Sequence, residues 1–220
     1  MQPLYAEAFR LHLLAGLEEE LRQSGFSRIA GVDEVGRGCL AGPVVAAAVI
    51  VDPRRLVPGV DDSKRLDAPV REVLAGEIRR SALGWAVASV SADEIDRGDI
   101  LRATRRAMEQ ALRSLRPAPD CALIDAVALP LLPFPCLPVV RADSLCYAVA
   151  SASLVAKVER DRMMGEYDRE YPQYGFAQHK GYAVSEHRRA LATYGPSPIH
   201  RLTFGTVVPR QAEEGGRTAA

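Results

Sequence analysis

The sequence has no excess of charge of either sign: among its 220 residues, 28 Lys and Arg balance 28 Asp and Glu. A strongly basic chain would indicate a nucleic-acid partner through bulk electrostatics, and that indication is missing here. The balance argues only mildly against such a partner, because a site built from carboxylates would cancel part of a positive surface in the sum. The distribution of the charges along the chain therefore matters more than their total.

Cysteine is scarce, and its few residues show no CxxC spacing. The surrounding stretches are apolar, which predicts buried thiols in a reducing compartment and disfavours zinc ligands or disulfides. The cysteines are Cys39, Cys121, Cys136 and Cys146.

Long apolar runs are also missing. The longest, residues 39–51, contains Gly42 and Pro43 and is shorter than the roughly 20 residues that span a bilayer. The first residues include Glu7 and no basic leader, unlike a secretory signal. We therefore expect a cytoplasmic protein without a membrane segment. A GxxxxGK[ST] run is absent too, which excludes a phosphate-binding-loop nucleotide hydrolase.

What is present is an alternation of strand-like and helix-like segments in a chain long enough for one domain with a substantial core. Two β-rich runs come first, separated by a glycine-rich turn, and they predict a hairpin. Strands are expected at residues 27–35, 43–51, 83–90, 121–126 and 138–141. The second of these is almost wholly apolar, as in a strand that is covered on both faces. The pattern predicts an α/β layer fold with a mixed sheet.

Helices are expected between these strands because apolar residues recur there at helical spacing. The first, residues 5–21, has an apolar stripe of Phe9, Leu13 and Leu17, and the second begins after a capping residue, Asp67. The stripe of the second helix consists of Val70, Val73, Leu74 and Ile78.

Cap signals mark the remaining helices. Ser91 and Glu94 have the spacing of a capping box, and a longer helix restarts at Asp99. Further helices are expected over residues 144–167 and from Ser185 to the C-cap Gly195. Residues 209–220 lack an apolar pattern, and we expect a disordered tail there.

Acidic residues interrupt the apolar strands at their carboxyl ends. Asp33 and Glu34 end the first strand, Asp125 lies inside LIDA (123–126), and Asp143 follows the last strand. Sites in α/β sheets form at this edge, where loops diverge. Taken singly, each acid could equally be a turn or cap residue. Together, they predict a shared site.

A carboxylate cluster of this kind implies a cation. Two unit charges 4 Å apart repel by about 4 kcal/mol at an effective dielectric near 20, so a cluster without a cation would destabilise the fold. Oxygen ligands without His or Cys suit Mg²⁺ or Mn²⁺, which also bind phosphate oxygens. Asp33 and Glu34 pose a difficulty, because neighbouring strand residues point to opposite faces. Gly36 and Gly38 give the backbone freedom to bend there.

The sequence resembles the ribonuclease HII family, the type 2 ribonucleases H. The resemblance spans residues 29–204 and rests on several motifs in the family's order. They are GVDEVGRG (31–38), GPVV (42–45), DSK (62–64), RADS (141–144) leading into 148–157, KGY (180–182) and YGPSPIHR (194–201). The resemblance implies a ribonuclease H-like fold, with a central mixed sheet flanked by helices and a helical C-terminal extension. The catalytic domain would cover residues 1–208.

The resemblance also implies the roles of the site residues. Asp33, Glu34, Asp125 and Asp143 would be the catalytic ligands of divalent ions, Mg²⁺ or Mn²⁺. The residues implied to bind substrate are Gly36, Arg37, Gly38, Lys64, Lys180 and Tyr182. The family usually has glycine after the third acid, where this chain has Ala126. A methyl group there could slow the reaction by crowding the substrate.

The activity implied is hydrolysis of the phosphodiester 5′ of a ribonucleotide, in RNA–DNA hybrids and in duplex DNA with a single ribonucleotide. Two metal ions would clamp the phosphate, and the products would carry a 5′-phosphate and a 3′-hydroxyl. The expected partners are these duplexes, with no obligatory protein partner. Lys157 and Arg201 are further candidates for phosphate contacts, against the alternative of a solvated basic face.

The sequence leaves other roles for these residues, and other functions for the protein, open. The Gly-x-Gly sequence could be an ordinary hairpin turn, Tyr182 a core tyrosine, and His179, His187 and His200 structural residues. A junction resolvase of the same fold would also use an acidic cluster, although the KGY and GRG motifs argue against it. A binding module that has lost its metal is a third possibility, and the intact acids argue against that.

Overall fold

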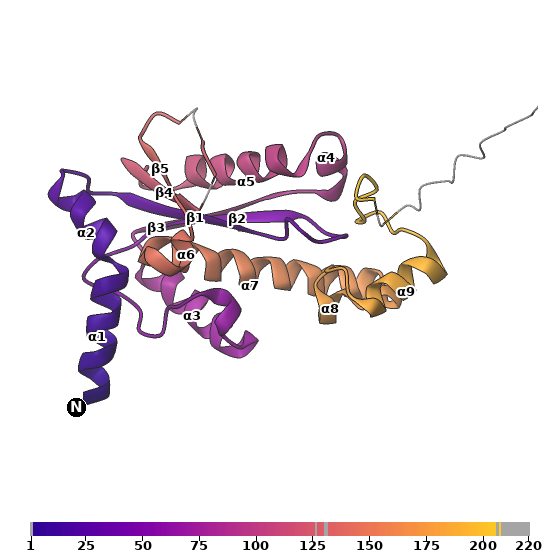
Figure 1. Ribbon diagram of the computed structural model, residues 1–220, viewed down its shortest axis with the longest axis horizontal. Coiled ribbons are helices and arrows are strands. Elements are labelled where there is room, and N and C mark those ends of the chain that lie inside the picture. The colour runs from indigo at the N-terminus through magenta and orange to yellow at the C-terminus, as the bar shows by residue number, and fades with distance from the viewer. Residues whose placement is uncertain (1, 126, 130–131, 206, 208–220) are drawn as a thin grey trace, which may run out of the picture.

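A mixed five-stranded sheet with helices on both faces forms the centre of the protein (Figure 1). The computed structural model describes residues 2–125, 127–129, 132–205 and 207. Ala126 and the expected tail at 209–220 lie outside the described residues. The strands are β1 (Ile29–Val35), β2 (Val44–Ile50), β3 (Gly84–Val90), β4 (Cys121–Asp125) and β5 (Cys136–Val139).

The sheet order is β3-β2-β1-β4-β5. The strand β1 pairs antiparallel with β2 and parallel with β4, and β4 pairs parallel with β5. The predicted opening hairpin and mixed sheet are therefore confirmed. The last strand begins and ends two residues earlier than expected, and Arg141, which was expected within it, adopts a left-handed conformation with φ of 58°.

The helices were predicted less accurately than the strands. They are α1 (Gln2–Leu14), α2 (Gly16–Gln23), α3 (Ala68–Ser81), α4 (Ala92–Asp96), α5 (Ile100–Ser114), α6 (Ala142–Leu145), α7 (Tyr147–Glu170), α8 (Phe176–His179) and α9 (Ser185–Tyr194), with 3₁₀ turns η1 (Ser63–Arg65) and η2 (Pro172–Tyr174). The single helices expected at 5–21 and 144–167 are each two helices. In the second case Cys146 is extended, with φ −131° and ψ 122°, and interrupts the helix.

The two faces of the sheet are covered by different helices. Helix α5 packs on one face, and α7 with α3 packs on the other. Every residue of β2 is buried, as its apolar sequence predicts. Helix α7 lies so close to β1 that a Cβ at Gly31 would be 2.1 Å from the carbonyl carbon of Ala148. This contact fixes α7 against the strand that carries Asp33 and Glu34.

Two predicted apolar stripes are wrong in part. Phe9 and Leu13 are each 62% exposed, and Val70 and Val73 also face solvent. The buried face of α1 instead includes Leu11, which packs in the cluster under α3 and α7. These two helices lie at the edge of the core, where a narrow strip of apolar side chains is sufficient to hold them.

The capping signals were more reliable. The Ser91–Glu94 capping box is present, Asp99 accepts a hydrogen bond from the backbone of Arg102, and Gly195 is the C-cap of α9. Asp67 occupies the N-cap position of α3, but its side chain makes no capping hydrogen bond. No helix within the described part of the chain is long and apolar enough to cross a membrane.

Candidate active site

The carboxyl ends of β1 and β4 meet at one edge of the sheet and border a cavity of about 270 Å³. We call it the acidic cavity. Its lining is Asp33, Glu34, Val35, Gly36, Arg37, Gly38, Ser63, Lys64, Asp125, Asp143, Ser153, Lys157 and Tyr182. The four predicted acids and all predicted substrate-binding residues except Lys180 therefore lie around one cavity. Ser63 and Ser153 were not predicted, and their hydroxyl oxygens are 3.1 Å apart.

Lys180 lies in an adjoining and larger groove of about 710 Å³. Lys157 and Tyr182 line both hollows, so the groove continues from the acidic cavity. The groove runs between α3, α7 and α8, and Arg71, Arg162 and His179 also contribute to its walls. An extended ligand that occupied the cavity would have room to continue along this groove.

Three of the four acids contact a charged side chain or a backbone N–H, and the fourth, Asp33, has the hydroxyl of Ser153 as its partner. Glu34 is 3.2 Å from Nη1 of Arg37, and Asp143 is 3.4 Å from Nζ of Lys64. Oδ1 of Asp125 accepts a hydrogen bond of 2.9 Å from the backbone of Ala142, at the start of α6.

Burial and mutual repulsion make the ionised carboxylates costly. Burial, followed by the charge of Glu34, raises the pKa of Asp33 to about 8, although the hydroxyl of Ser153 acts in the opposite direction. Burial also raises the pKa of Glu34, while Arg37 lowers it. Oε2 of Glu34 is buried without a hydrogen-bond partner among the described residues. A buried acceptor of this kind is expensive unless something donates to it or coordinates it.

The chemistry of these donors fits a hard divalent cation, which oxygen ligands prefer. A cation would satisfy Oε2 of Glu34 and offset the burial of Asp33. Within the described ranges, however, no group of three or more His, Cys, Asp or Glu is arranged to hold a metal ion.

Two buried arginines donate hydrogen bonds to backbone carbonyls in the loops beside the cavity. Arg201 is fully buried and donates to the carbonyls of Gly36, Arg37 and Gly42. The prediction that it contacts a phosphate is wrong, because the guanidinium is used inside the protein. Arg160 is equally buried, and sequence reasoning missed it because arginine in a long helix is ordinarily a surface residue.

Arg160 explains one of the two glycines of the GRG turn (36–38). Gly36 has φ of 95°, and a Cβ there would lie 2.2 Å from Nε of Arg160. A Cβ at Gly38 would meet nothing within 4 Å. The first glycine is thus required by packing inside the protein, whereas the second faces open space.

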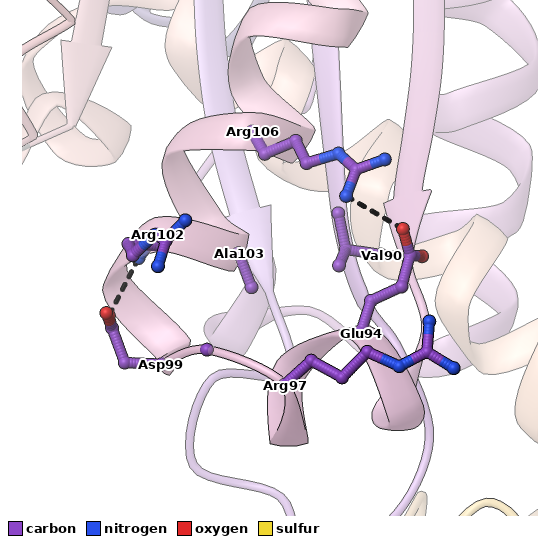
Figure 2. Close-up of a pocket in the computed structure, with 8 residues that line it drawn as sticks. Val90, Glu94, Arg97, Asp99, Arg102, Ala103 and Arg106 are labelled. Carbon is purple, nitrogen blue, oxygen red and sulfur yellow. Dashed lines mark hydrogen bonds and ion pairs between the residues drawn. The ribbon is translucent and has the colours of Figure 1, made fainter.

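A further hollow, of about 310 Å³, lies at the start of α5 and is rich in arginine (Figure 2). Arg106 pairs with Glu94 at 2.8 Å, and Arg97 pairs with Asp93 at 2.6 Å. None of the predicted site residues lines it. We therefore take the acidic cavity as the candidate active site.

The sheet order, the flanking helices and the carboxylates at the ends of neighbouring parallel strands define a ribonuclease H-like protein. The structure is similar to the ribonuclease H2 from Pyrococcus horikoshii OT3, with a TM-score of 0.71 and 28% identity, covering 82% of this chain and 95% of that one.

Sequence comparison identifies the branch of this fold. The family profile described as "Ribonuclease HII" matches residues 30–207. The ribonuclease HII of Solibacter usitatus is 50% identical over 193 residues, covering 88% of this chain and 84% of that protein. The ribonuclease HII of Chloroflexus aurantiacus is 50% identical over 197 residues, covering 87% and 93%. The chain belongs to the ribonuclease HII family, which comprises hydrolytic endonucleases with ribonuclease H activity on RNA–DNA hybrids.

Proposed function

We propose that this enzyme cuts on the 5′ side of a ribonucleotide, both in RNA–DNA hybrids and at a single ribonucleotide embedded in duplex DNA. The observation that supports it is the meeting of acidic residues, the GRG turn and Tyr182 around one cavity. A carboxylate site that holds metal is indifferent to the sugar, so recognition of the ribose must come from neighbouring groups that can contact its 2′-hydroxyl.

In this proposal Asp33, Glu34, Asp125 and Asp143 hold divalent cations, Mg²⁺ or Mn²⁺. When bound, the ions would supply activation of a water and stabilisation of the departing 3′-oxygen. By holding the ions, the four acids would position the scissile phosphate, and hydrolysis of its P–O3′ bond by water would give a 5′-phosphate and a 3′-hydroxyl. Lys64, in contact with Asp143, lies where it can also meet a phosphate oxygen.

Recognition of the sugar falls to the GRG turn and Tyr182, which line the same cavity. Gly38 faces open space, so its backbone can approach the ribose closely. Tyr182 is 41% exposed and lines the same cavity, so its ring can pack on the adjoining deoxyribose. Arg37, Lys157 and Lys180 would contact backbone phosphates on either side.

We also propose that residues 1–208 act as one catalytic unit. The first helix is tied to the body by Glu7, which accepts a hydrogen bond of 2.8 Å from the backbone of Gly59. The C-terminal segment is tied by Asp96, which accepts hydrogen bonds from the backbones of Leu202 and Thr203.

The test uses end-labelled duplexes of one sequence in four forms: an RNA–DNA hybrid, DNA with one ribonucleotide, all-DNA, and a branched all-DNA junction. With Mg²⁺ or Mn²⁺ we expect cuts in the first two only, 5′ of the ribonucleotide. Tyr182→Ala should reduce cutting at the single ribonucleotide by at least about 10-fold. The exposed Tyr5 on α1 provides the control, because Tyr5→Ala should leave the cuts unchanged.

The rival functions give other patterns in the same gel. Cleavage of the junction without a ribonucleotide would support the resolvase, and retention without any cut would support the binding module. Efficient cutting of all-DNA duplex would reject the proposal.

A further inference from the structure

Three histidines pack together beside the Tyr182 carbonyl. Two of them belong to α8 and α9, which lie at the far end of α7 (Figure 1). We call His179, His187 and His200 the histidine cluster. The rings of His179 and His187 stack with centroids 4.4 Å apart, and those of His187 and His200 are 5.1 Å apart. His187 and His200 are buried. Neither the acidic cavity nor the proposed reaction uses these side chains directly.

The hydrogen bonds of the cluster assign each proton. A carbonyl only accepts, so Nδ1 of His187, 2.8 Å from the Tyr182 carbonyl oxygen, must carry a hydrogen. A backbone N–H only donates, so Nδ1 of His200, 2.8 Å from the nitrogen of Ser197, must be bare. The Nε2 atoms of these two histidines are 2.9 Å apart. One hydrogen fits between them, and it belongs to His200.

His179 follows the same logic. Its Nδ1 accepts from the backbone of Gly181 at 3.1 Å, and its Nε2 donates to the carbonyl of Tyr174 at 2.7 Å. All three imidazoles are therefore neutral, with His187 in the Nδ1–H form and the other two in the Nε2–H form. Burial supports neutrality, since it lowers the pKa of His187 and, together with the charge of His187, lowers that of His200 to about 4.

The cluster holds a turn that would not keep its shape alone. Lys180 and Gly181 both have positive φ, 53° and 80°, a conformation that costs energy at a lysine. Arg160 donates to the carbonyl of Lys180, and the backbone of Leu40 donates to that of Gly181. His187 donates to the Tyr182 carbonyl. Each carbonyl from residue 180 to 182 thus has a donor outside the turn, and the Tyr182 carbonyl also accepts from the backbone of Val184 at 2.9 Å.

We infer that His179, His187 and His200 are positioning residues, which hold Tyr182 at the substrate through one fixed arrangement of neutral tautomers. The inference rests on the proposed function for the role of Tyr182, but not for the tautomers themselves. His179 holds the backbone of Gly181 and supports the ring of His187. His200 accepts a hydrogen bond from the backbone of Ser197 and donates one to His187. It thereby fixes the tautomer in which His187 donates to the Tyr182 carbonyl.

The first arm of the test reads the tautomers directly. The chain has 4 histidines, and long-range ¹H–¹⁵N spectra of the wild-type protein at neutral pH distinguish the Nδ1–H and Nε2–H forms of each. We expect one Nδ1–H form, from His187, and Nε2–H forms for His179 and His200, with His187→Asn used for assignment. A charged or exchanging imidazole at His187 or His200 would overturn the inference, whatever the activity.

The second arm measures coupling to Tyr182. His187→Leu should lower kcat/KM for the single-ribonucleotide duplex by about 10-fold, the effect of one lost hydrogen bond. His187→Asn keeps a donor near the position of Nδ1 and should recover part of that loss. His12→Leu, a change at an exposed histidine of α1, should have no effect.

The double variant separates positioning from a general structural role. If His187 acts through Tyr182, adding His187→Leu to Tyr182→Ala should cause little further loss. Multiplicative losses, with a wild-type enzyme that requires the ribonucleotide, would overturn the inference and leave the proposed function standing. A wild-type enzyme indifferent to the ribonucleotide would overturn both.

Discussion

Asp33 combines two opposed requirements in one side chain. It is buried against α7, at the β1 end of the acidic cavity, where an ionised carboxylate is poorly solvated and is repelled by Glu34. The same burial makes Asp33 a suitable ligand for a divalent cation, because little water is present there to compete with the carboxylate for the cation. When Asp33 loses its charge, the cleavage rate should therefore fall, whereas the free energy of unfolding should rise.

We predict that Asp33→Asn lowers the cleavage rate by at least about 10²-fold with saturating Mg²⁺, the scale of lost preorganised electrostatics. The fold should survive, because asparagine has nearly the same shape. The exposed Asp67, whose side chain makes no capping bond, provides the control. Asp67→Asn should cut at the wild-type rate. Near-normal turnover by a folded Asp33→Asn enzyme would remove Asp33 from the site.

The pH dependence of stability should change with the same variant. The pKa of Asp33 is raised from 3.8 to about 8, so between these values the folded state holds a proton that the unfolded state has released. The free energy of unfolding of the metal-free protein should then fall as pH rises through this window. Urea titrations in chelator should show a shallower fall for Asp33→Asn than for wild type. Parallel curves would contradict the assigned pKa.

At the scale of elements, one buried acid joins α2 to α7. Glu18 on α2 is fully buried, and its Oε1 accepts a hydrogen bond of 2.7 Å from the backbone of Ala148, in the first turn of α7. The first N–H groups of a helix lack partners within it, so this carboxylate caps α7 from outside. Burial raises the pKa of Glu18, and the Ala148 contact opposes that effect.

We predict that Glu18→Ala lowers the free energy of unfolding by about 1–3 kcal/mol, because the Ala148 N–H is left buried and unpaired. Glu18→Gln keeps an acceptor and should lose clearly less. The neighbouring exposed Glu19 is the control, and Glu19→Gln should change little. The measurement is thermal or urea unfolding at neutral pH. Equal losses for Glu18→Ala and Glu18→Gln would show that charge, rather than the hydrogen bond, matters.

Most strands and helix starts could be predicted from the sequence, because strand burial and helix caps are local patterns. An all-apolar run predicted the buried β2, and the Ser91–Glu94 spacing predicted the start of α4. The breaks at Ala15 and Cys146 were missed, since both residues are compatible with a continuous helix. At each break the backbone departs from helical dihedrals, and neither residue carries a local signal such as proline or glycine for that departure.

In the candidate site, too, local patterns could be predicted and tertiary contacts could not. The acids could be grouped because they interrupt strands whose carboxyl ends meet at one edge. The roles of Arg160, Arg201 and Glu18 could not be predicted, because charged residues are ordinarily exposed. Their partners are backbone carbonyls or N–H groups far along the chain, which have no sequence signature.

For the whole molecule, the zero net charge gives no net attraction for a duplex, so the local distribution of charge must supply the attraction. Affinity must then come from individual phosphate contacts around the cavity and the groove. Each such contact releases counterions, so the logarithm of the binding constant should fall linearly with the logarithm of salt concentration, by about 0.9 per phosphate neutralised. The ribose hydroxyl carries no charge and should not affect that slope.

We predict that Lys180→Gln reduces the slope by about 1 for both single-ribonucleotide and all-DNA duplexes, because Lys180 lines the groove beside the cavity. Arg105→Gln, at an exposed position of α5 on the opposite face of the sheet, should leave the slope unchanged. Fluorescence anisotropy in chelator measures binding without cleavage. Tyr182→Ala should lower the preference for the ribonucleotide while keeping the wild-type slope, because its contact is uncharged. A wild-type slope in Lys180→Gln would remove Lys180 from the phosphate contacts and place the duplex outside the groove.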